Sequence, residues 1–252
     1  MSEFTLNWGI VSAGLISQDF CTAVLSLQSN YHKLVGVAAR NIDDAIKFAQ
    51  RFKLQYHYDS YDELFNNKEI NIVYIGSINT THRDMCIKAI NAGKHILCEK
   101  PMCINPTEQE EILKLAKEKG VFFMEALWTR FFPIISRIKE EIAKGEIGDL
   151  KFFISNFMVP IKDIDRIRKL ELGGGAILDI GIYPIQLACL MFNNETPIKI
   201  TATGHLMDTG VDECCTIVLL FSDQRIAQIN ISTNTTMFAP TYLVGTKGVL
   251  NV

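Results

Sequence analysis

Three side chains of this sequence have the chemistry to move a proton beside a hydroxyl-bearing carbon: Lys100, Asp179 and Tyr183. Lys100 follows an apolar run typical of a parallel strand, and the carboxyl ends of such strands are where open α/β sheets bind ligands. An ammonium group at that edge favours an alkoxide or a phenolate close by. Asp179 and Tyr183 lie four positions apart in an apolar helical run, so they share one face and the tyrosine could accept a hydroxyl proton.

Each of these residues also has a structural interpretation. Lys100 could be a surface lysine at a turn fixed by Pro101, and Tyr183 could be a core or rim residue of its helix. An aspartate in an apolar helix needs a partner under either interpretation. The three residue types alone leave acid–base chemistry and a structural role both open.

A nucleotide-binding unit is indicated ahead of Lys100. Residues 6–12 are typical of a buried strand, and a tight turn, a helix and a second strand at 34–39 follow. Such a βαβ unit can hold a pyrophosphate at its first turn. The G-x-G-x-x-G template retains only its middle glycine, and many α/β proteins begin in this way without binding a dinucleotide. The expected pyrophosphate-binding residues are Ser12, Gly14, Leu15 and Ile16.

The residue after the second strand bears on the choice of dinucleotide. An acidic residue there binds the ribose 2′-hydroxyl of NAD, whereas a basic residue suits the 2′-phosphate of NADP. This chain has Arg40, so NADP is the expected cofactor, and the alternative is a solvated charge at a strand end. Further cofactor contacts are expected after two later strands, at Asn79, His82, Glu99 and Lys100. For His82 the alternative is a solvent-facing residue in the first turn of a helix.

The elements around these residues predict an α/β fold of two domains. Up to residue 127, strands alternate with helices, which predicts a parallel, doubly wound sheet in a Rossmann domain at 1–127. From residue 128, helices near 133–144 and 176–191 accompany several strands, and apolar–polar alternation at 227–232 is typical of an antiparallel sheet. The second domain, 128–252, is therefore expected to be α+β with an open, mostly antiparallel sheet.

The composition limits the cofactors and partners. A formal net charge of -3 over 252 residues does not favour a nucleic-acid-binding surface. The seven cysteines lack a zinc-binding spacing, so no metal is expected and a reduced, cytoplasmic protein is favoured. The first residues lack the basic region of a signal peptide. The longest apolar stretch, 176–192, is interrupted by Asp179 and is too short to span a bilayer, so no membrane association is expected.

Five segments spread over the chain together carry a family resemblance. They are Trp8 to Ser17, Val37 to Arg40, Leu97 to Met102, Met124 to Pro133, and Gly174 to Tyr183. In this order they resemble the Gfo/Idh/MocA oxidoreductases, and within that family the dimeric dihydrodiol dehydrogenases, also described as NADP-dependent D-xylose dehydrogenases. The segments around Lys100, Trp128 and Tyr183 are more specific than the glycine turn.

The resemblance implies a role for each candidate residue. Gly14 and its turn bind pyrophosphate, and Arg40 binds the 2′-phosphate. Lys100 and Tyr183 are the catalytic pair, and Asp179 lines the substrate site. Hydride then passes between NADP and a vicinal diol of the trans-1,2-dihydrobenzene-1,2-diol type, or a cyclic sugar such as D-xylose. A homodimer through the open face of the C-terminal sheet is also implied.

Two further expectations follow from the same resemblance. The alternative function is a non-catalytic NADP-binding regulator or an inactive truncated paralogue, although the presence of Lys100, Asp179 and Tyr183 favours the enzyme. Family members extend well beyond the segment that matches 245–248, so the C-terminal domain is expected to be incomplete relative to the family. Made alone, the 252-residue chain is expected to bind NADPH, to turn over substrate poorly and to self-associate.

Overall fold

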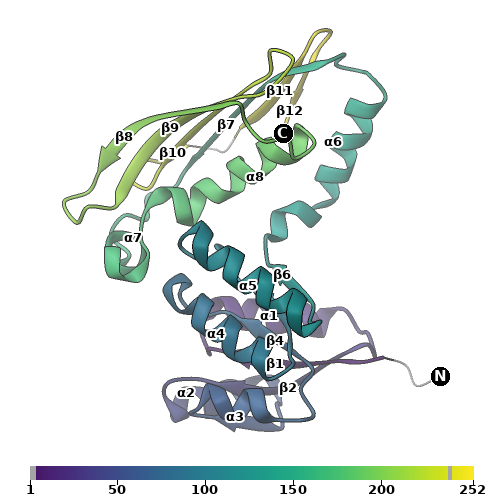
Figure 1. Cartoon of the computed structure of the whole chain (residues 1–252), viewed down its shortest axis with the longest axis vertical. Coiled ribbons are helices and arrows are strands. Elements are labelled where there is room, and N and C mark those ends of the chain that lie inside the picture. Colours follow the sequence, from purple (N-terminus) through teal and green to yellow (C-terminus); the bar gives the residue numbers. More distant parts are fainter. Residues whose placement is uncertain (1–3, 238–239) are drawn as a thin grey trace. The chain divides into compact units, whose positions relative to one another are not determined.

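The computed structural model describes residues 4–237 and 240–252. The chain divides into two compact units, Met1–Ala126 and Leu127–Val252. Each unit has its own sheet and its own hydrophobic core. In Figure 1 the first unit is coloured purple to teal and the second teal to yellow.

The first unit is built on a six-stranded parallel sheet with the order β3-β2-β1-β4-β5-β6. Its strands are β1 (Leu6–Val11), β2 (His32–Ala38), β3 (Tyr56–Tyr58), β4 (Ile72–Ile75), β5 (His95–Cys98) and β6 (Phe123–Glu125). Its helices are α1 (Leu15–Ser26), α2 (Ile42–Phe52), α3 (Tyr61–Asn66), α4 (Asn79–Asn91) and α5 (Pro106–Lys119). The strand order reverses between β1 and β4, and doubly wound sheets bind ligands at that reversal. The predicted parallel Rossmann sheet is confirmed.

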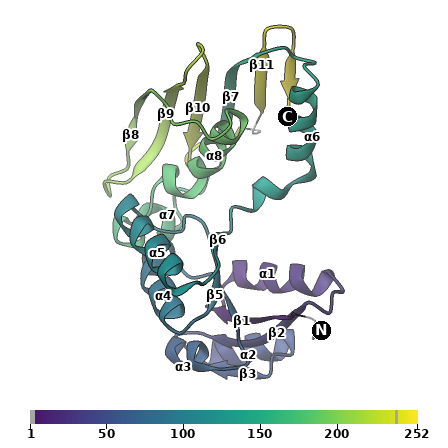
Figure 2. The same cartoon turned by 45° about the vertical axis from the view of Figure 1, so that its right-hand side comes forward.

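Both faces of this sheet are covered by helices. Trp8 and Ile10 of β1 pack with residues of α1 and α2, whereas Val11 packs with residues of α3, α4 and α5. Alternate side chains of a strand point to opposite faces, so a strand covered on both sides is apolar throughout. This explains the unbroken apolar run of β4. Figures 1 and 2 show α4 and α5 lying side by side on their face of the sheet.

The helix ends follow from local side-chain chemistry. The Asn41 side chain accepts the Asp43 N–H at the start of α2, and the Asn105 side chain accepts the Glu108 N–H at the start of α5. Gly120, with φ +66°, ends α5 in the left-handed conformation, as its sequence predicts. One element, β3, was not predicted, because a three-residue edge strand carries too little periodicity.

The second unit contains a six-stranded mixed sheet with the order β12-β11-β7-β10-β9-β8. Its strands are β7 (Leu150–Met158), β8 (Lys199–Leu206), β9 (Asp212–Leu220), β10 (Ile226–Ser232), β11 (Thr241–Gly245) and β12 (Val249–Asn251). The pair β7–β10 is parallel, and the neighbouring pairs β8–β9, β9–β10, β7–β11 and β11–β12 are antiparallel. The predicted mostly antiparallel sheet is confirmed.

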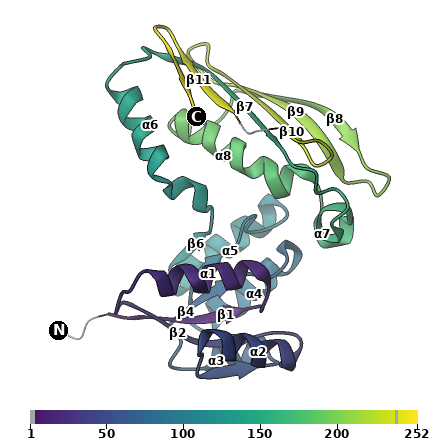
Figure 3. The same cartoon turned by 180° about the vertical axis from the view of Figure 1, so that it is seen from behind.

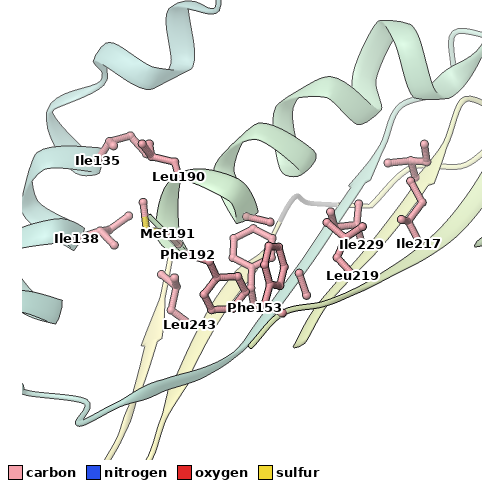
Figure 4. Packing of buried hydrophobic residues seen from close by; sticks show 14 of the residues in the cluster. Ile135, Ile138, Phe153, Leu190, Met191, Phe192, Ile217, Leu219, Ile229 and Leu243 are labelled. Atoms are coloured by element: carbon pink, nitrogen blue, oxygen red, sulfur yellow. The ribbon is translucent and has the colours of Figure 1, made fainter. Parts of the chain in front are cut away.

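One face of this sheet is covered by helix α8 (Ile182–Met191), which lies along it in Figures 1 and 3. The shared core includes Phe153 of β7 and Phe192, which follows α8, and both are fully buried. Figure 4 shows these two rings together, with Ile135 and Ile138 of α6 (Pro133–Ala143) near the end of α8. This packing fixes the position of α8 against the strands.

A helical segment of this unit, Leu170–Met191, passes the test for a membrane-spanning helix by length and composition. It has 22 residues and a mean hydropathy of 1.5, so the prediction that the apolar stretch is too short was wrong. The helix is longer because short helical turns precede the apolar run. This is weak evidence for a membrane span, because core helices pass the same test and Ile180, Ala188 and Leu190 are buried in the core.

Candidate active site

The turn between β1 and α1 has the geometry of a phosphate-binding turn. Ser12 adopts φ +84°, the left-handed region that explains why glycine is common at this position of the template. A Cβ on Gly14 would meet no described protein atom closer than 3.6 Å, so the fold itself does not require glycine there. The first turn of α1 contains no acidic residue, and its Leu15 side chain is 81% exposed. An anion can therefore approach both the turn and the positive end of the helix.

Ser17 occupies the third position of the template and is fully buried. A Cβ on Gly76, which follows β4, would overlap the Ser17 hydroxyl oxygen. Gly76, directly after β4, is thus the small residue that lets α1 pack closely on the sheet. A glycine at position 17 of the turn is not needed for this packing. This exchange accounts for a serine at a position where the template has glycine.

Arg40 lies exposed directly after β2 and before α2. Burial raises the pKa of Tyr61, and the positive charge of Arg40 opposes that increase, so the guanidinium lies close enough to act on this ring. Ala13 of the turn after β1 borders a hollow of about 240 Å³. It is lined by Ala13, Gln18, Asp44, Lys47, Phe48 and Arg51.

His82 connects the loops that follow β4 and β5. Its Nδ1 lies 2.8 Å from the Pro101 carbonyl oxygen, and its Nε2 lies 2.9 Å from the Ser77 carbonyl oxygen. The residue is 1% exposed, so the solvent-facing interpretation of His82 is wrong. Burial lowers the pKa of His82, and the two carbonyl groups only partly oppose this effect. The histidine joins two loops that the sequence places beside the cofactor.

Glu99 and Lys100 directly follow β5, at the carboxyl edge where Lys100 was predicted. The Glu99 side chain is buried, and its Oε1 accepts the Tyr74 hydroxyl at 2.5 Å. Its Oε2 accepts the backbone N–H of Lys100 at 3.2 Å. Lys100 is half-buried, so it is not a fully solvated surface lysine. Asn79 opens α4 at the end of the neighbouring strand, as the site prediction requires.

In the second unit, the glycine run determines where the helix with Asp179 begins. A Cβ on Gly174 would overlap the Ile167 carbonyl oxygen. Gly175 has φ +120°, and the Asp212 carboxylate occupies the position that a Cβ on Gly175 would take. Asp212 Oδ2 accepts the Ile177 N–H at 2.7 Å. The first turn of this helix is a π-helical turn, η3 (Ile177–Gly181), rather than the predicted α-helix, and π turns are frequent at functional sites.

Asp179 and Tyr183 each have a partner that sequence reasoning did not find. Asp179 forms an ion pair with Arg166 of the short helix α7 (Asp165–Arg168). The Tyr183 hydroxyl accepts the indole N–H of Trp128 at 3.1 Å. The rings of Trp128 and Phe157 approach Tyr183 edge-on, with centroids 6.1 Å and 5.8 Å away. A half-buried carboxylate needs a cationic partner, and this need of Asp179 is the feature of the sequence that could have predicted a partner such as Arg166.

The structure therefore places the predicted site residues in two groups. Ser12, Gly14, Arg40, His82, Glu99 and Lys100 lie in the first unit, around the carboxyl ends of β1, β2, β4 and β5. Asp179 and Tyr183 lie in the second unit, on consecutive helical segments with Trp128 beside them. The first group has the features of a dinucleotide site, and the second those of a proton-transfer site.

Known proteins share both units. Residues 6–127 match the oxidoreductase family with an NAD-binding Rossmann fold, and residues 135–251 match the GFO/IDH/MocA C-terminal domain. The trans-1,2-dihydrobenzene-1,2-diol dehydrogenase of Xenopus tropicalis is 40% identical over 246 residues, which are 98% of this chain and 74% of the relative. The enzyme of the same name from Mus musculus is 38% identical over 247 residues, with the same coverage.

Solved structures give the same fold. GenD2 from gentamicin A biosynthesis, in complex with NAD, has a TM-score of 0.90 at 22% identity and matches 100% of this chain and 73% of its own. KijD10, a 3-ketoreductase from Actinomadura kijaniata in complex with NADP, has a TM-score of 0.89 at 25% identity and matches 98% of this chain and 76% of its own. Both sequence domains and the relatives at 40% identity lead to one assignment: this chain is an oxidoreductase of the Gfo/Idh/MocA family.

Proposed function

We propose that this chain is an NADP-dependent dehydrogenase of vicinal diols, with trans-1,2-dihydrobenzene-1,2-diol as the model substrate and cyclic sugars such as D-xylose as the second class. The observation that carries the proposal is the environment of Tyr183, whose hydroxyl oxygen accepts the Trp128 N–H beside the carboxylate-bearing turn of Asp179. The names of the relatives at 40% identity support the same substrate class.

The cofactor part of the proposal rests on the first unit. The turn at Gly14 leaves room for a pyrophosphate, and the start of α1 has no acidic residue to repel it. For the 2′-phosphate, Arg40 is exposed at the end of β2, and Lys47 and Arg51 line the hollow beside the turn. A guanidinium meets a phosphate through two parallel, charge-assisted hydrogen bonds, which NAD does not offer at this position.

The proton-transfer part of the proposal rests on Tyr183. The Trp128 indole N–H holds the Tyr183 oxygen in place by a hydrogen bond, and we propose this oxygen as the group that accepts the proton of a substrate hydroxyl. As the catalytic residue of the first unit we propose Lys100, whose ammonium group can stabilise negative charge on a substrate oxygen. A bound nicotinamide would take the hydride from the same substrate carbon.

Asp179 and the aromatic residues account for a diol. The ion pair with Arg166 holds the Asp179 carboxylate in place, and a carboxylate accepts hydrogen bonds from a second hydroxyl. Trp128 is 52% exposed and shares an apolar surface with Phe157 beside Tyr183. An unsaturated six-membered ring packs on such a surface better than a pentose does, which favours the dihydrodiol.

We also propose that the chain forms a homodimer through its C-terminal sheet. Every residue of the edge strand β8 is exposed, including Ile200 and Leu206 at 63% and 69%. An exposed apolar edge strand is a typical pairing surface. Light scattering should give the mass of two chains, and Ile200→Lys should shift it to the mass of one.

The test of the catalytic proposal is a panel of substrates and cofactors. Formation of reduced nicotinamide is followed with NADP or NAD and with trans-1,2-dihydrobenzene-1,2-diol, its cis isomer, D-xylose and a monohydroxy alcohol. The proposal predicts the highest kcat/KM for NADP with the trans diol. Higher rates with NAD, or equal rates with the monohydroxy alcohol, would contradict it.

A further inference from the structure

Tyr74 lies in the centre of the first unit, yet it carries a hydroxyl group. It is the third residue of β4 and is 2% exposed. Its ring stacks on Phe20 of α1 with centroids 4.0 Å apart and planes 1° apart, and Phe20 in turn contacts Trp8 of β1. The ring is held between helix and sheet, so the direction of its hydroxyl is fixed. A buried hydroxyl is costly unless it is bonded, and this one is bonded to Glu99.

Glu99 accepts a hydrogen bond with each of its two oxygens, one from Tyr74 and one from Lys100. Oε1 accepts the Tyr74 hydroxyl at 2.5 Å, and Oε2 accepts the Lys100 N–H at 3.2 Å. Four groups act on this carboxyl: Tyr74 from β4, Glu125 from β6, and the adjoining Cys98 and Lys100. Burial raises the pKa of Glu99, while the two hydrogen bonds and the Lys100 charge oppose this increase. The Lys100 charge is therefore close enough to stabilise the carboxylate, and by reciprocity the carboxylate stabilises the ammonium.

We propose that Tyr74 and Glu99 are a pair of positioning residues that hold the backbone of Lys100 and place a negative charge close to its ammonium group. Tyr74 fixes the orientation of the Glu99 carboxylate, and Glu99 fixes the backbone at Lys100 and supplies the opposite charge. Neither residue is proposed to touch the substrate. The inference rests on the catalytic role proposed for Lys100, but the effect on the amine itself can be measured without turnover.

The variants for the test are Tyr74→Phe and Glu99→Gln. Tyr74→Phe keeps the ring that stacks on Phe20 and removes only the hydroxyl. Glu99→Gln keeps the shape and removes the charge. The matched control is Tyr58→Phe, which removes a hydroxyl of β3 that accepts a bond from Asn67 at 3.0 Å in the same unit.

The first measurement is trace acetylation with acetic anhydride at fixed pH, quantified at Lys100 by peptide mass spectrometry and normalised to the exposed Lys114. Only the uncharged amine reacts, so we expect acetylation of Lys100 to be about threefold or more faster in Glu99→Gln, and faster to a smaller degree in Tyr74→Phe. Tyr58→Phe should match the parent. Circular dichroism identifies any variant that does not fold, and Tyr74→Phe keeps the test possible if Glu99→Gln is unstable.

The second measurement is the kinetic profile with NADP and the diol. Both variants should lower kcat by about tenfold with a smaller change in KM, and their double variant should be no worse than Glu99→Gln alone. The optimum pH should also move in both variants but not in the control. Parent-like acetylation of Lys100 in both variants would overturn the inference. If acetylation changes as expected but the parent shows no turnover on any substrate, the positioning pair stands and the proposed function fails.

Discussion

Replacing Gly175 with alanine tests how the glycine run builds the site. Gly175 has φ +120°, and a side chain in such a conformation costs about 1–3 kcal/mol. The added Cβ would also overlap the Asp212 carboxylate and displace its bond to the Ile177 N–H, and a hydrogen bond to a charged group contributes about 1.5–3 kcal/mol. The two contributions together predict that Gly175→Ala lowers the free energy of unfolding of the second unit by about 2.5–6 kcal/mol.

Gly210 provides a matched control. It also has positive φ, at +85°, but a Cβ there would meet nothing within 4 Å, so Gly210→Ala carries only the backbone cost. Urea unfolding followed by circular dichroism gives the stability difference. Hydrogen exchange of 177–191 shows whether the helix that carries Asp179 and Tyr183 has loosened. Equal losses of stability in the two variants, with unchanged exchange in that helix, would refute the reasoning.

Four other substitutions have defined outcomes. Arg40→Asp should weaken NADP binding by about tenfold or more and spare NAD, whereas Asp44→Ala should tighten NADP by about twofold, both measured by NADPH fluorescence titration. Trp128→Phe removes the donor to the Tyr183 hydroxyl, so kcat should fall by about three- to tenfold with NADPH binding unchanged in the same titration. Burial raises the pKa of Glu99 above its ordinary value of 4.5, so the unfolded chain loses this proton at a lower pH than the folded chain does. The contribution of protonated Glu99 to the free energy of unfolding is therefore complete below pH 4.5, and it is lost as the pH rises through the raised pKa. Glu99→Gln should therefore show a flatter dependence of the urea midpoint on pH over that window, and a parallel dependence would contradict the assignment.

The sequence was informative where local geometry determines the residue type. Gly120 and the glycines at 173–175 mark turns or close approaches, and the structure shows a positive φ or a close contact at each place. The apolar runs of β1, β4 and β5 predict a sheet buried on both faces, which in turn places Lys100 at a carboxyl edge.

The sequence was uninformative where the partner is distant in the chain. Nothing near Tyr74 indicates that its hydroxyl meets Glu99, which lies 25 positions away, directly after the neighbouring strand β5. The same holds for Trp128 and Tyr183, which are 55 positions apart. For His82, nothing local decided between the cofactor site and the solvent-facing alternative, because a histidine in a first helical turn has no local feature that predicts two carbonyl partners. Such contacts arise from tertiary packing, which periodicity does not encode.

The central claim is that Tyr183 transfers the proton in an NADP-linked oxidation of a diol. The most direct measurement compares the parent with Tyr183→Phe in the steady-state reduction of NADP by trans-1,2-dihydrobenzene-1,2-diol, with NADPH affinity determined alongside. The variant keeps the ring among Trp128 and Phe157 and loses only the oxygen. The account predicts a loss of kcat of about a hundredfold or more, with NADPH affinity nearly unchanged. A variant that turns over at nearly the parent rate would contradict it.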